Sequence, residues 1–416
     1  MKIIGGAVLV LTASLACEDS STPRTPEPNS TITDSAGVTI VDSHKPMWSQ
    51  DEAWTVSARP TTSIGLADGP QELQLFRVSD AVRLADGRIG ILNSSSAELR
   101  VFDVAGRFVT SIGGSGRGPG EFLRPEHVVR MAGDTLAVWD SGVTEVSYFD
   151  PAGAFVRRES LDLSHVMEVI GPTRATEMLT PLPDGSFILH VTVRESSRQI
   201  PTNQLYRPPL GYYRFHRDSA RVDSLGWYGG LAQMVVETGG RRTPVITLLP
   251  IRSSVTGGGD PLHVFAGGGE HFDIDVFDGD GHHTRTIRRT DGLVPVTAEI
   301  RELSRASRLD PGERSDRRQE VERLLDALPA QDFFPAYYDL VTDSEGCLWA
   351  QAANGWQVFD PDGTWLGTVG LPIPRVFEIG FDYVLGLRWD DDGIEHVMLY
   401  ALDRKPMPHP HPCSAA

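Results

Sequence analysis

Short runs in which apolar and polar residues alternate recur along the chain, and turn residues separate them. Alternation with a period of two predicts β-strands that bury one face. The same motif, Phe-Asp-x-x-Gly, closes four of these runs, at residues 102–106, 149–153, 277–281 and 359–363. Its aspartate can accept hydrogen bonds from the turn backbone, and its glycine can adopt the left-handed conformation. Each copy therefore predicts a tight hairpin.

A second kind of hairpin is predicted upstream of these motifs. A Gly/Asp turn followed by an apolar strand occurs at residues 84–92, 131–139, 182–191 and 342–350. Two hairpins in series make a four-stranded unit. The first two Phe-Asp-x-x-Gly motifs begin at residues 102 and 149, a spacing close to the length of one propeller blade.

Counting such units predicts an all-β fold, a six-bladed β-propeller over residues 37–405. The expected blades are residues 76–112, 125–162, 174–228, 243–289, 333–370 and 377–404. The sixth has only three strands of its own, so we expect the N-terminal strand 37–42 to complete it and close the ring.

Residues 296–329 interrupt the strand pattern between the fourth and fifth blades. Their helical spacing predicts a short insertion of two helices, at 297–308 and 314–328, on either side of Pro311. We expect the helices to cap one face of the propeller or contact a partner, with the cap favoured. Their apolar positions are Ile300, Leu303, Val321, Leu324, Leu325 and Leu328.

The glycine-rich segment GGSGRGPGEFLRPEHVVRM, residues 113–131, has two interpretations: a phosphate-binding loop or a connector. No Lys-Ser/Thr follows Gly118, and a strand rather than a helix is expected next. Residues 69–84 repeat its Gly-Pro, Glu and apolar pattern ahead of the preceding unit. We therefore predict a connector between blades.

The first residues are typical of an export signal. Lys2 precedes a short apolar run at 3–11, which is too short to span a bilayer, and small residues precede Cys17. Residues 14–17, SLAC, resemble a bacterial lipobox, although Ser14 departs from its preference for Leu, Val or Ile. The expectation is a signal peptide at 1–16, lipidation of Cys17 and a flexible tether at 17–36; a plain secretory signal is the alternative. The protein would then be exported and held on a cell-envelope membrane, at the outer membrane or periplasmic face.

The net charge and the cysteine content of the chain limit the partners and cross-links that we expect. The formal net charge of −18 makes nucleic acid an improbable partner, because phosphate contacts need a basic face. Cys347 and Cys413 could form a disulfide in an oxidising compartment, but the sequence does not show that they meet. Otherwise we expect a monomer with an unknown protein or small-molecule ligand.

The Gly-Pro-x-Glu connectors, the Phe-Asp-x-x-Gly hairpins and the six units together resemble the six-bladed β-propeller lipoproteins of bacteria, related to NHL-repeat and TolB-type propellers. The resemblance covers residues 37–405 and implies the fold. It implies little about function, because such propellers serve as binding modules, scaffolds and a few hydrolases and lyases.

A propeller usually binds ligands at the mouth of its central channel, which the innermost strands line. Those strands are expected to begin near Asp80, Glu126, Met178, Thr243, Tyr337 and Glu378. We take Asp80, Glu126, His127 and Tyr337 as candidate channel-mouth residues. A solvated Glu126 and a packed His127 are the simpler interpretation.

Similarity to gluconolactonase- and paraoxonase-style propellers implies a possible Ca²⁺ site, since these bind Ca²⁺ through oxygen ligands from several blades. The candidate ligands here are Glu126, Asn93 and Asp140. No other cofactor is indicated.

Three further groups of residues have a functional and a structural interpretation. Residues 271–283, HFDIDVFDGDGHH, lack the EF-hand spacing and are better explained as a strand entering its turn. The tail, with His409, His411 and Cys413, could bind a soft metal but is more simply a chain end. A carbohydrate site would need exposed aromatics, for which Trp227, Tyr228, Tyr337 and Tyr338 are candidates.

The sequence has no signature of nucleophilic catalysis. It favours a lipid-anchored binding or scaffolding module without enzymatic activity, and the alternative is a Ca²⁺-dependent hydrolase or lyase.

Overall fold

Six four-stranded blades follow one another along the chain in the computed structural model, which describes residues 28–49, 51–171, 174–193, 200–238, 240–309 and 314–405. In the first five blades the strands pair antiparallel in chain order, and the first strands of most neighbouring blades contact one another. The protein is thus an all-β, six-bladed propeller, as the spacing of the hairpins predicts.

The strands of the first three blades lie close to their expected positions. They are β5 (Val78–Arg83), β6 (Ile89–Asn93), β7 (Glu98–Phe102) and β8 (Phe108–Gly113) in blade one; β9 (Pro125–Arg130), β10 (Leu136–Asp140), β11 (Glu145–Phe149) and β12 (Phe155–Ser160) in blade two; and β13 (Arg174–Pro181), β14 (Phe187–Val193), β16 (Pro209–His216) and β17 (Arg221–Gly229) in blade three.

The remaining blades complete the ring. Their strands are β20 (Ser254–Gly258), β21 (His263–Gly267), β22 (Asp273–Phe277) and β23 (His283–Arg288) in blade four; β24 (Leu340–Thr342), β25 (Leu348–Ala352), β26 (Gly355–Phe359) and β27 (Trp365–Val369) in blade five; and β28 (Arg375–Ile379), β29 (Tyr383–Trp389) and β30 (Glu395–Asp403) in blade six.

Six clusters of buried apolar side chains join consecutive blades. Burying one such side chain contributes about 1.5–3 kcal/mol. Because the sixth cluster joins the last blade to the first, the ring is closed. Representative pairs, in order from the interface of blades one and two, are Leu99 and Val138, Trp139 and Phe187, Ile188 and Val264, Ile274 and Leu348, Trp349 and Val384, and Leu385 and Ile91.

The Phe-Asp-x-x-Gly turns form as expected. In the first of them Asp103 Oδ1 accepts hydrogen bonds from the backbone N–H groups of Ala105 and Arg107, both at 2.9 Å. Gly106 has a φ of 77°, in the left-handed region that favours glycine. The repeated motif is therefore a structural device for closing hairpins.

The glycine-rich segment is a connector, as predicted. It joins β8 to β9, and Glu121 Oε2 accepts a hydrogen bond from the Gly118 N–H at 2.6 Å. Arg158 fixes it to the next blade by donating to the carbonyl oxygens of Gly118 and Glu121 at 2.6 and 2.8 Å. The Glu121 carboxylate and the Arg158 guanidinium thus bond to backbone groups of the connector.

An N-terminal segment closes the last blade, but it is not the predicted one. β4 (Thr62–Ile64) pairs with β30, placing Ile64 opposite Val397, and β3 (Thr55–Val56) pairs with the end of β30. The expectation for residues 37–42 is wrong: β2 (Val38–Ser43) runs parallel to β23 on the outer edge of blade four. Both segments alternate, so only the geometry of the ring selects between them.

Before β2 the chain forms β1 (Ser30–Ser35), which pairs with β2 as a hairpin. The tether predicted for residues 17–36 is therefore too long, since residues 30–35 are a strand. Residues 1–27 and 406–416 lie outside the described residues, so the signal peptide, the lipidation of Cys17 and the metal-binding tail with His409, His411 and Cys413 stay predictions.

Cys347 is completely buried and disulfide-bonded. Cys413 lies outside the described residues, so the pairing of these two cysteines also stays a prediction.

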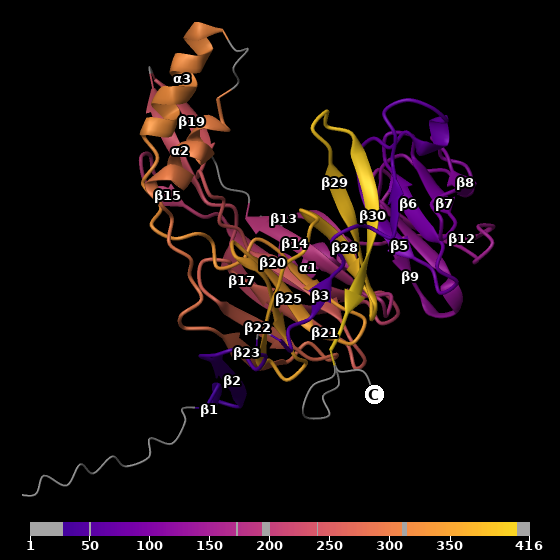
Figure 1. Ribbon diagram of the computed structural model, residues 1–416, viewed down its shortest axis with the longest axis horizontal. Helices are drawn as coiled ribbons and strands as arrows, with labels where there is room; N and C mark the ends of the chain where they lie inside the picture. The colour runs from indigo at the N-terminus through magenta and orange to yellow at the C-terminus, as the bar shows by residue number, and fades with distance from the viewer. Residues whose placement is uncertain are drawn as a thin grey trace, which may run out of the picture.

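Three insertions lie on one side of the ring, in the connections β14–β16, β17–β20 and β23–β24. The first two contribute β15 (Leu205–Tyr206), β18 (Gln233–Thr238) and β19 (Arg241–Ile246), which form a three-stranded sheet. The third is the predicted helical insertion, with α2 (Ala298–Ala306) and α3 (Ser315–Asp326). Figure 1 shows the helices beside β15 and β19, projecting from the blades.

The structure of the insertions differs from two expectations, one for Thr243 and one for the helices. Thr243 lies in β19 rather than in the first strand of blade four, which begins at Ser254. The alternation at 241–246 does form a strand, but its partner is β18. The helices contact the loop after β19, where Arg308 donates to the Thr247 carbonyl oxygen at 3.1 Å. Of the apolar helix positions, Leu325 is buried whereas Leu303 is exposed, so the helices are attached to the neighbouring insertion.

The other helical segments are short: α1 (Ser164–Ile170), which packs between blades two and three, and two 3-10 turns at Gln71–Leu73 and Ala132–Asp134. None of the helices in the described part of the chain is long and apolar enough to cross a membrane.

Candidate functional site

The structure brings two of the predicted channel residues together. Asp80 Oδ2 lies 3.4 Å from Nδ1 of His127 and accepts a hydrogen bond from the Val128 N–H at 3.1 Å. Asp80 belongs to β5 and His127 to β9, so this contact joins the inner strands of blades one and two. Glu126 is next to His127 but accepts a hydrogen bond from the Ser141 hydroxyl at 2.6 Å.

Tyr337 is not a channel-mouth residue. Its side chain is completely buried between blades four and five, and its hydroxyl accepts a hydrogen bond from the Gly269 N–H at 3.1 Å. Burial raises the pKa of this hydroxyl above its ordinary value. The expectation is wrong because the Tyr337 side chain fills the space between two blades. The alternation of apolar and polar residues alone does not reveal this packing.

Two of the residues proposed as calcium ligands, Asn93 and Asp140, use their side-chain oxygens to bind backbone groups of the segments that connect strands. Asn93 Oδ1 accepts a hydrogen bond from the Phe76 N–H at 2.8 Å, and Asp140 accepts from the N–H groups of Leu123, Arg124 and Gly142 at 2.6, 2.8 and 2.8 Å. Both residues end the second strand of their blades. Across the described ranges, no group of three or more His, Cys, Asp and Glu side chains could hold a metal ion. Calcium binding by Glu126, Asn93 and Asp140 stays a prediction.

A cavity of about 840 Å³ lies between blades three and four, and residues of the first two insertions line part of it. It falls within the usual size range of small-molecule sites. Its walls come from β13, β14, β16 and β20, from the chain around β15 and after β17, and from Asp339 before β24. The lining residues are Thr180, His190, Thr192, Val193, Ile200, Tyr206, Pro208, Pro209, Leu210, Tyr212, Gly230, Leu231, Arg252, Ser253, Ser254, Val255 and Asp339.

A buried polar group stands in the wall of this cavity. The ring of His190 packs edge-on against Tyr212, with centroids 5.0 Å apart, and its Nε2 is buried without a hydrogen-bond partner. Burial, with a smaller contribution from His127, lowers the pKa of His190 to about 4. The imidazole is therefore neutral at pH 7, with one ring nitrogen a donor and the other an acceptor.

Tyr212 is fixed by its own hydrogen bond. Its hydroxyl donates to Oγ of Ser253 at 2.8 Å, and burial raises the pKa of Tyr212 to about 12. This bond links blade three to the start of blade four, so it joins two sides of the cavity.

Two opposite charges face the same cavity. Arg252 donates from Nε to the Tyr338 carbonyl oxygen at 3.2 Å, and Asp339 Oδ1 accepts from the Ser254 hydroxyl at 3.1 Å and the Leu340 N–H at 3.0 Å. These bonds engage only Nε of Arg252 and only Oδ1 of Asp339. Within the described chain, the terminal nitrogens of Arg252 and Oδ2 of Asp339 have no hydrogen-bond or ion-pair partner.

Sequence reasoning missed this site. His190 lies in the apolar strand FILHV, where an imidazole is unusual, and this was the one available signal. Arg252 and Ser253 fell in a segment that the sequence assigned to the interior of blade four. Their convergence with Asp339 depends on three connections of different length, so spacing did not reveal it.

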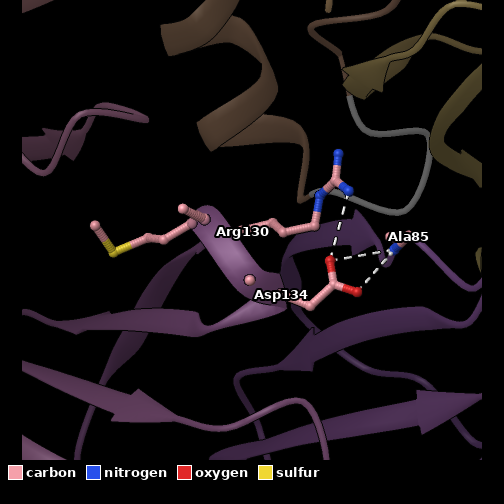
Figure 2. A pocket seen from close by; sticks show the side chains of 6 residues that line it. Ala85, Arg130 and Asp134 are labelled. Atoms are coloured by element: carbon pink, nitrogen blue, oxygen red, sulfur yellow. Dashed lines mark hydrogen bonds and ion pairs between the residues drawn. The ribbon is translucent and has the colours of Figure 1, made fainter.

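A second hollow, of about 440 Å³, lies at the opposite end of the blades. The first-to-second-strand turns of blades one and two form it, with Ala85 and residues 130–134. Figure 2 shows the Asp134 carboxylate directed toward Arg130 and the Ala85 N–H. It is 3.5 Å from Arg130 and accepts from Ala85 at 3.3 Å. Since this carboxylate already has partners, the hollow is the weaker candidate.

Comparison with known proteins agrees with the fold. A family model described as a 6-bladed beta-propeller matches residues 71–177. No curated protein sequence matches the chain.

Solved structures with similar folds are distant in sequence. A Bacteroides fragilis protein described as exported is 16% identical, covering 87% of this chain and 98% of its own, with a TM-score of 0.43. A member of the DUF4221 family from Bacteroides vulgatus is 10% identical, covering 85% and 99%, with a TM-score of 0.47. Regucalcin, a calcium-binding protein from Agrobacterium tumefaciens, is 12% identical, covering 84% and 95%, with a TM-score of 0.38. These similarities concern the fold alone.

Proposed function

We propose that this protein is an exported, lipid-anchored binding protein whose ligand occupies the cavity between blades three and four. The observation that carries the proposal is a cavity of about 840 Å³ whose walls contain a buried imidazole nitrogen without a partner. A buried polar atom left without a hydrogen bond costs about 1–3 kcal/mol. A ligand that reached the buried Nε2 of His190 and bonded to it would recover this free energy.

The composition of the walls supports binding of a small organic molecule. Binding sites of this kind are mainly apolar, with a few polar groups that fix orientation. Here Val193, Leu210 and Leu231 contribute apolar surface, while His190 and Asp339 contribute polar atoms. The insertions supply part of the wall, so the site depends on the elements that depart from a plain propeller.

Blocking the cavity is expected to abolish or strongly weaken ligand binding. Leu231 lines it and is 36% exposed, so a Leu231→Trp side chain can enter the cavity without disturbing a blade. A diverse metabolite library would be screened by thermal shift, and each hit would be titrated calorimetrically. Affinity for a hit should fall at least about tenfold, or 1.4 kcal/mol, in the variant.

The matched control is Leu205→Trp, at a residue that is 50% exposed and does not line the cavity. It should bind like the unmodified protein. Equal affinity of all three proteins for every ligand found would place binding elsewhere and contradict the proposal.

The membrane anchor rests on the sequence of residues 14–17, SLAC, and on the short apolar run before it. Several acyl chains on Cys17 would hold the protein on a membrane surface. In a bacterial host, the full chain should sediment with membranes and dissolve only in detergent, whereas Cys17→Ser should lose acylation and leave the membrane fraction. Acyl-free Cys17 in the membrane-bound protein, measured by mass spectrometry, would rule the anchor out.

A further inference from the structure

We infer that the ligand of this cavity is zwitterionic, a short apolar peptide with a free ammonium group and a free carboxylate. The inference rests on the proposed function, because it names the ligand class of the same site. It is carried by Arg252 and Asp339, which both line the cavity and keep atoms without a partner in the described chain.

Arg252 and Asp339 line the same cavity but do not neutralise each other. Arg252 is bonded to the carbonyl oxygen of Tyr338, the residue before Asp339, and Ser254 is bonded to Asp339 itself. These bonds hold both groups at the junction of blades four and five. Among the described residues no ion pair joins Arg252 to Asp339, although each has atoms without a partner. A ligand can therefore pair with both at once.

The chemistry of each group selects a complementary ligand group. A guanidinium binds a carboxylate through parallel N–H···O bonds, and a carboxylate oxygen accepts from an ammonium group. A purely anionic ligand would face repulsion from Asp339, and a purely cationic one would face repulsion from Arg252. A molecule with both charges satisfies both groups.

The rest of the cavity indicates a peptide rather than another zwitterion. Val193, Ile200 and Leu231 would contact apolar side chains. The neutral His190 has a buried nitrogen without a partner, which can bond to a peptide N–H or C=O.

Calorimetry with trileucine in four forms would test the inference: free, N-acetylated, C-amidated and doubly blocked. Each single block should weaken binding to the unmodified protein by about tenfold or more, because each removes a charge-assisted bond. In Asp339→Asn the effect of N-acetylation should fall below about twofold, and in Arg252→Gln the same should hold for C-amidation. Asparagine keeps the Oδ1 acceptor for Ser254 and Leu340, so the wall stays intact.

Arg107→Gln and Asp362→Asn serve as charge-matched controls, because these side chains are 81% and 78% exposed and do not line the cavity. Both should retain the full effect of blocking.

The outcomes separate this inference from the proposed function. Equal affinity for free and blocked peptides would contradict a zwitterionic ligand. So would a loss of affinity on N-acetylation that persists in Asp339→Asn, or on C-amidation that persists in Arg252→Gln. If no peptide binds but another ligand does, and Leu231→Trp abolishes its binding, the peptide inference is wrong and the proposed binding function stands. Failure of peptides and of the whole library would contradict both.

Discussion

Replacing Arg404 by methionine is expected to lower the free energy of unfolding by about 3–5 kcal/mol. Arg404 Nη2 lies 2.9 Å from Oδ2 of Asp343, and the two side chains are 1% and 0% exposed. Removing the arginine leaves the carboxylate buried without its countercharge. That cost explains why breaking a buried ion pair destabilises more than the pair itself stabilises.

The position of this pair increases the effect. Asp343 lies in the first turn of blade five, where it also accepts hydrogen bonds from the Cys347 N–H at 2.9 Å and the Trp349 indole at 2.8 Å. Arg404 follows the last strand of blade six and lies over the ring of Trp54, 4.5 Å from its centroid. The pair therefore ties the N-terminal segment and the end of blade six to blade five.

Urea unfolding followed by tryptophan fluorescence would measure the change. The control is the double variant Arg404→Met with Asp343→Asn, which removes both charges and should recover a substantial part of the loss. Two nitrogens of Arg404 have no partner, so the double variant also removes their desolvation cost. A single variant within about 0.5 kcal/mol of the unmodified protein would show that the pair has no role in stability.

Acidification from pH 6.5 to pH 4 is expected to destabilise the fold through His190 by up to about 3 kcal/mol. Burial lowers the pKa of this histidine from the ordinary 6.5 to about 4. In that window the unfolded chain binds the proton and the folded chain does not. The free energy of unfolding therefore falls as pH decreases through this window. The stability that depends on a neutral His190 is fully present above pH 6.5.

The measurement compares unfolding free energies at several pH values in the unmodified protein and in His190→Gln. Other titrating groups are common to both proteins and cancel in the difference. The variant should lack the part of the pH slope that His190 causes. His282→Gln is the control, because that side chain is 77% exposed and its removal should leave the slope intact. Identical slopes for the unmodified protein and His190→Gln would mean that His190 titrates normally in the fold.

Local chemistry made much of the propeller predictable. The aspartate and glycine of each Phe-Asp-x-x-Gly turn act within five residues, as the bonds from Asp103 illustrate. The connector before β9 is held by Glu121, a neighbour in sequence. Such short-range geometry is encoded where it occurs, so the hairpins, the blade count and the helical insertion could be read from the sequence.

The candidate site was not predictable in the same way. Its polar groups come from His190, Arg252 and Asp339, which are far apart in the chain and meet only because insertions of unequal length lie on one side of the ring. Tyr337 illustrates the same limit, since its spacing suggested a channel position whereas packing between blades buried it.

The sequence by itself determined most hairpin turns and the strands beside them, because alternation and turn residues act over a few residues. Only the tertiary structure decided which N-terminal strand closes the ring and which side chains face the cavity. Thr62 pairs with Leu399, and Val38–Ser43, with the same alternation, pairs with β23 instead. These choices depend on shape and burial across the whole ring, where segments with equivalent patterns compete for positions that only the assembled blades create.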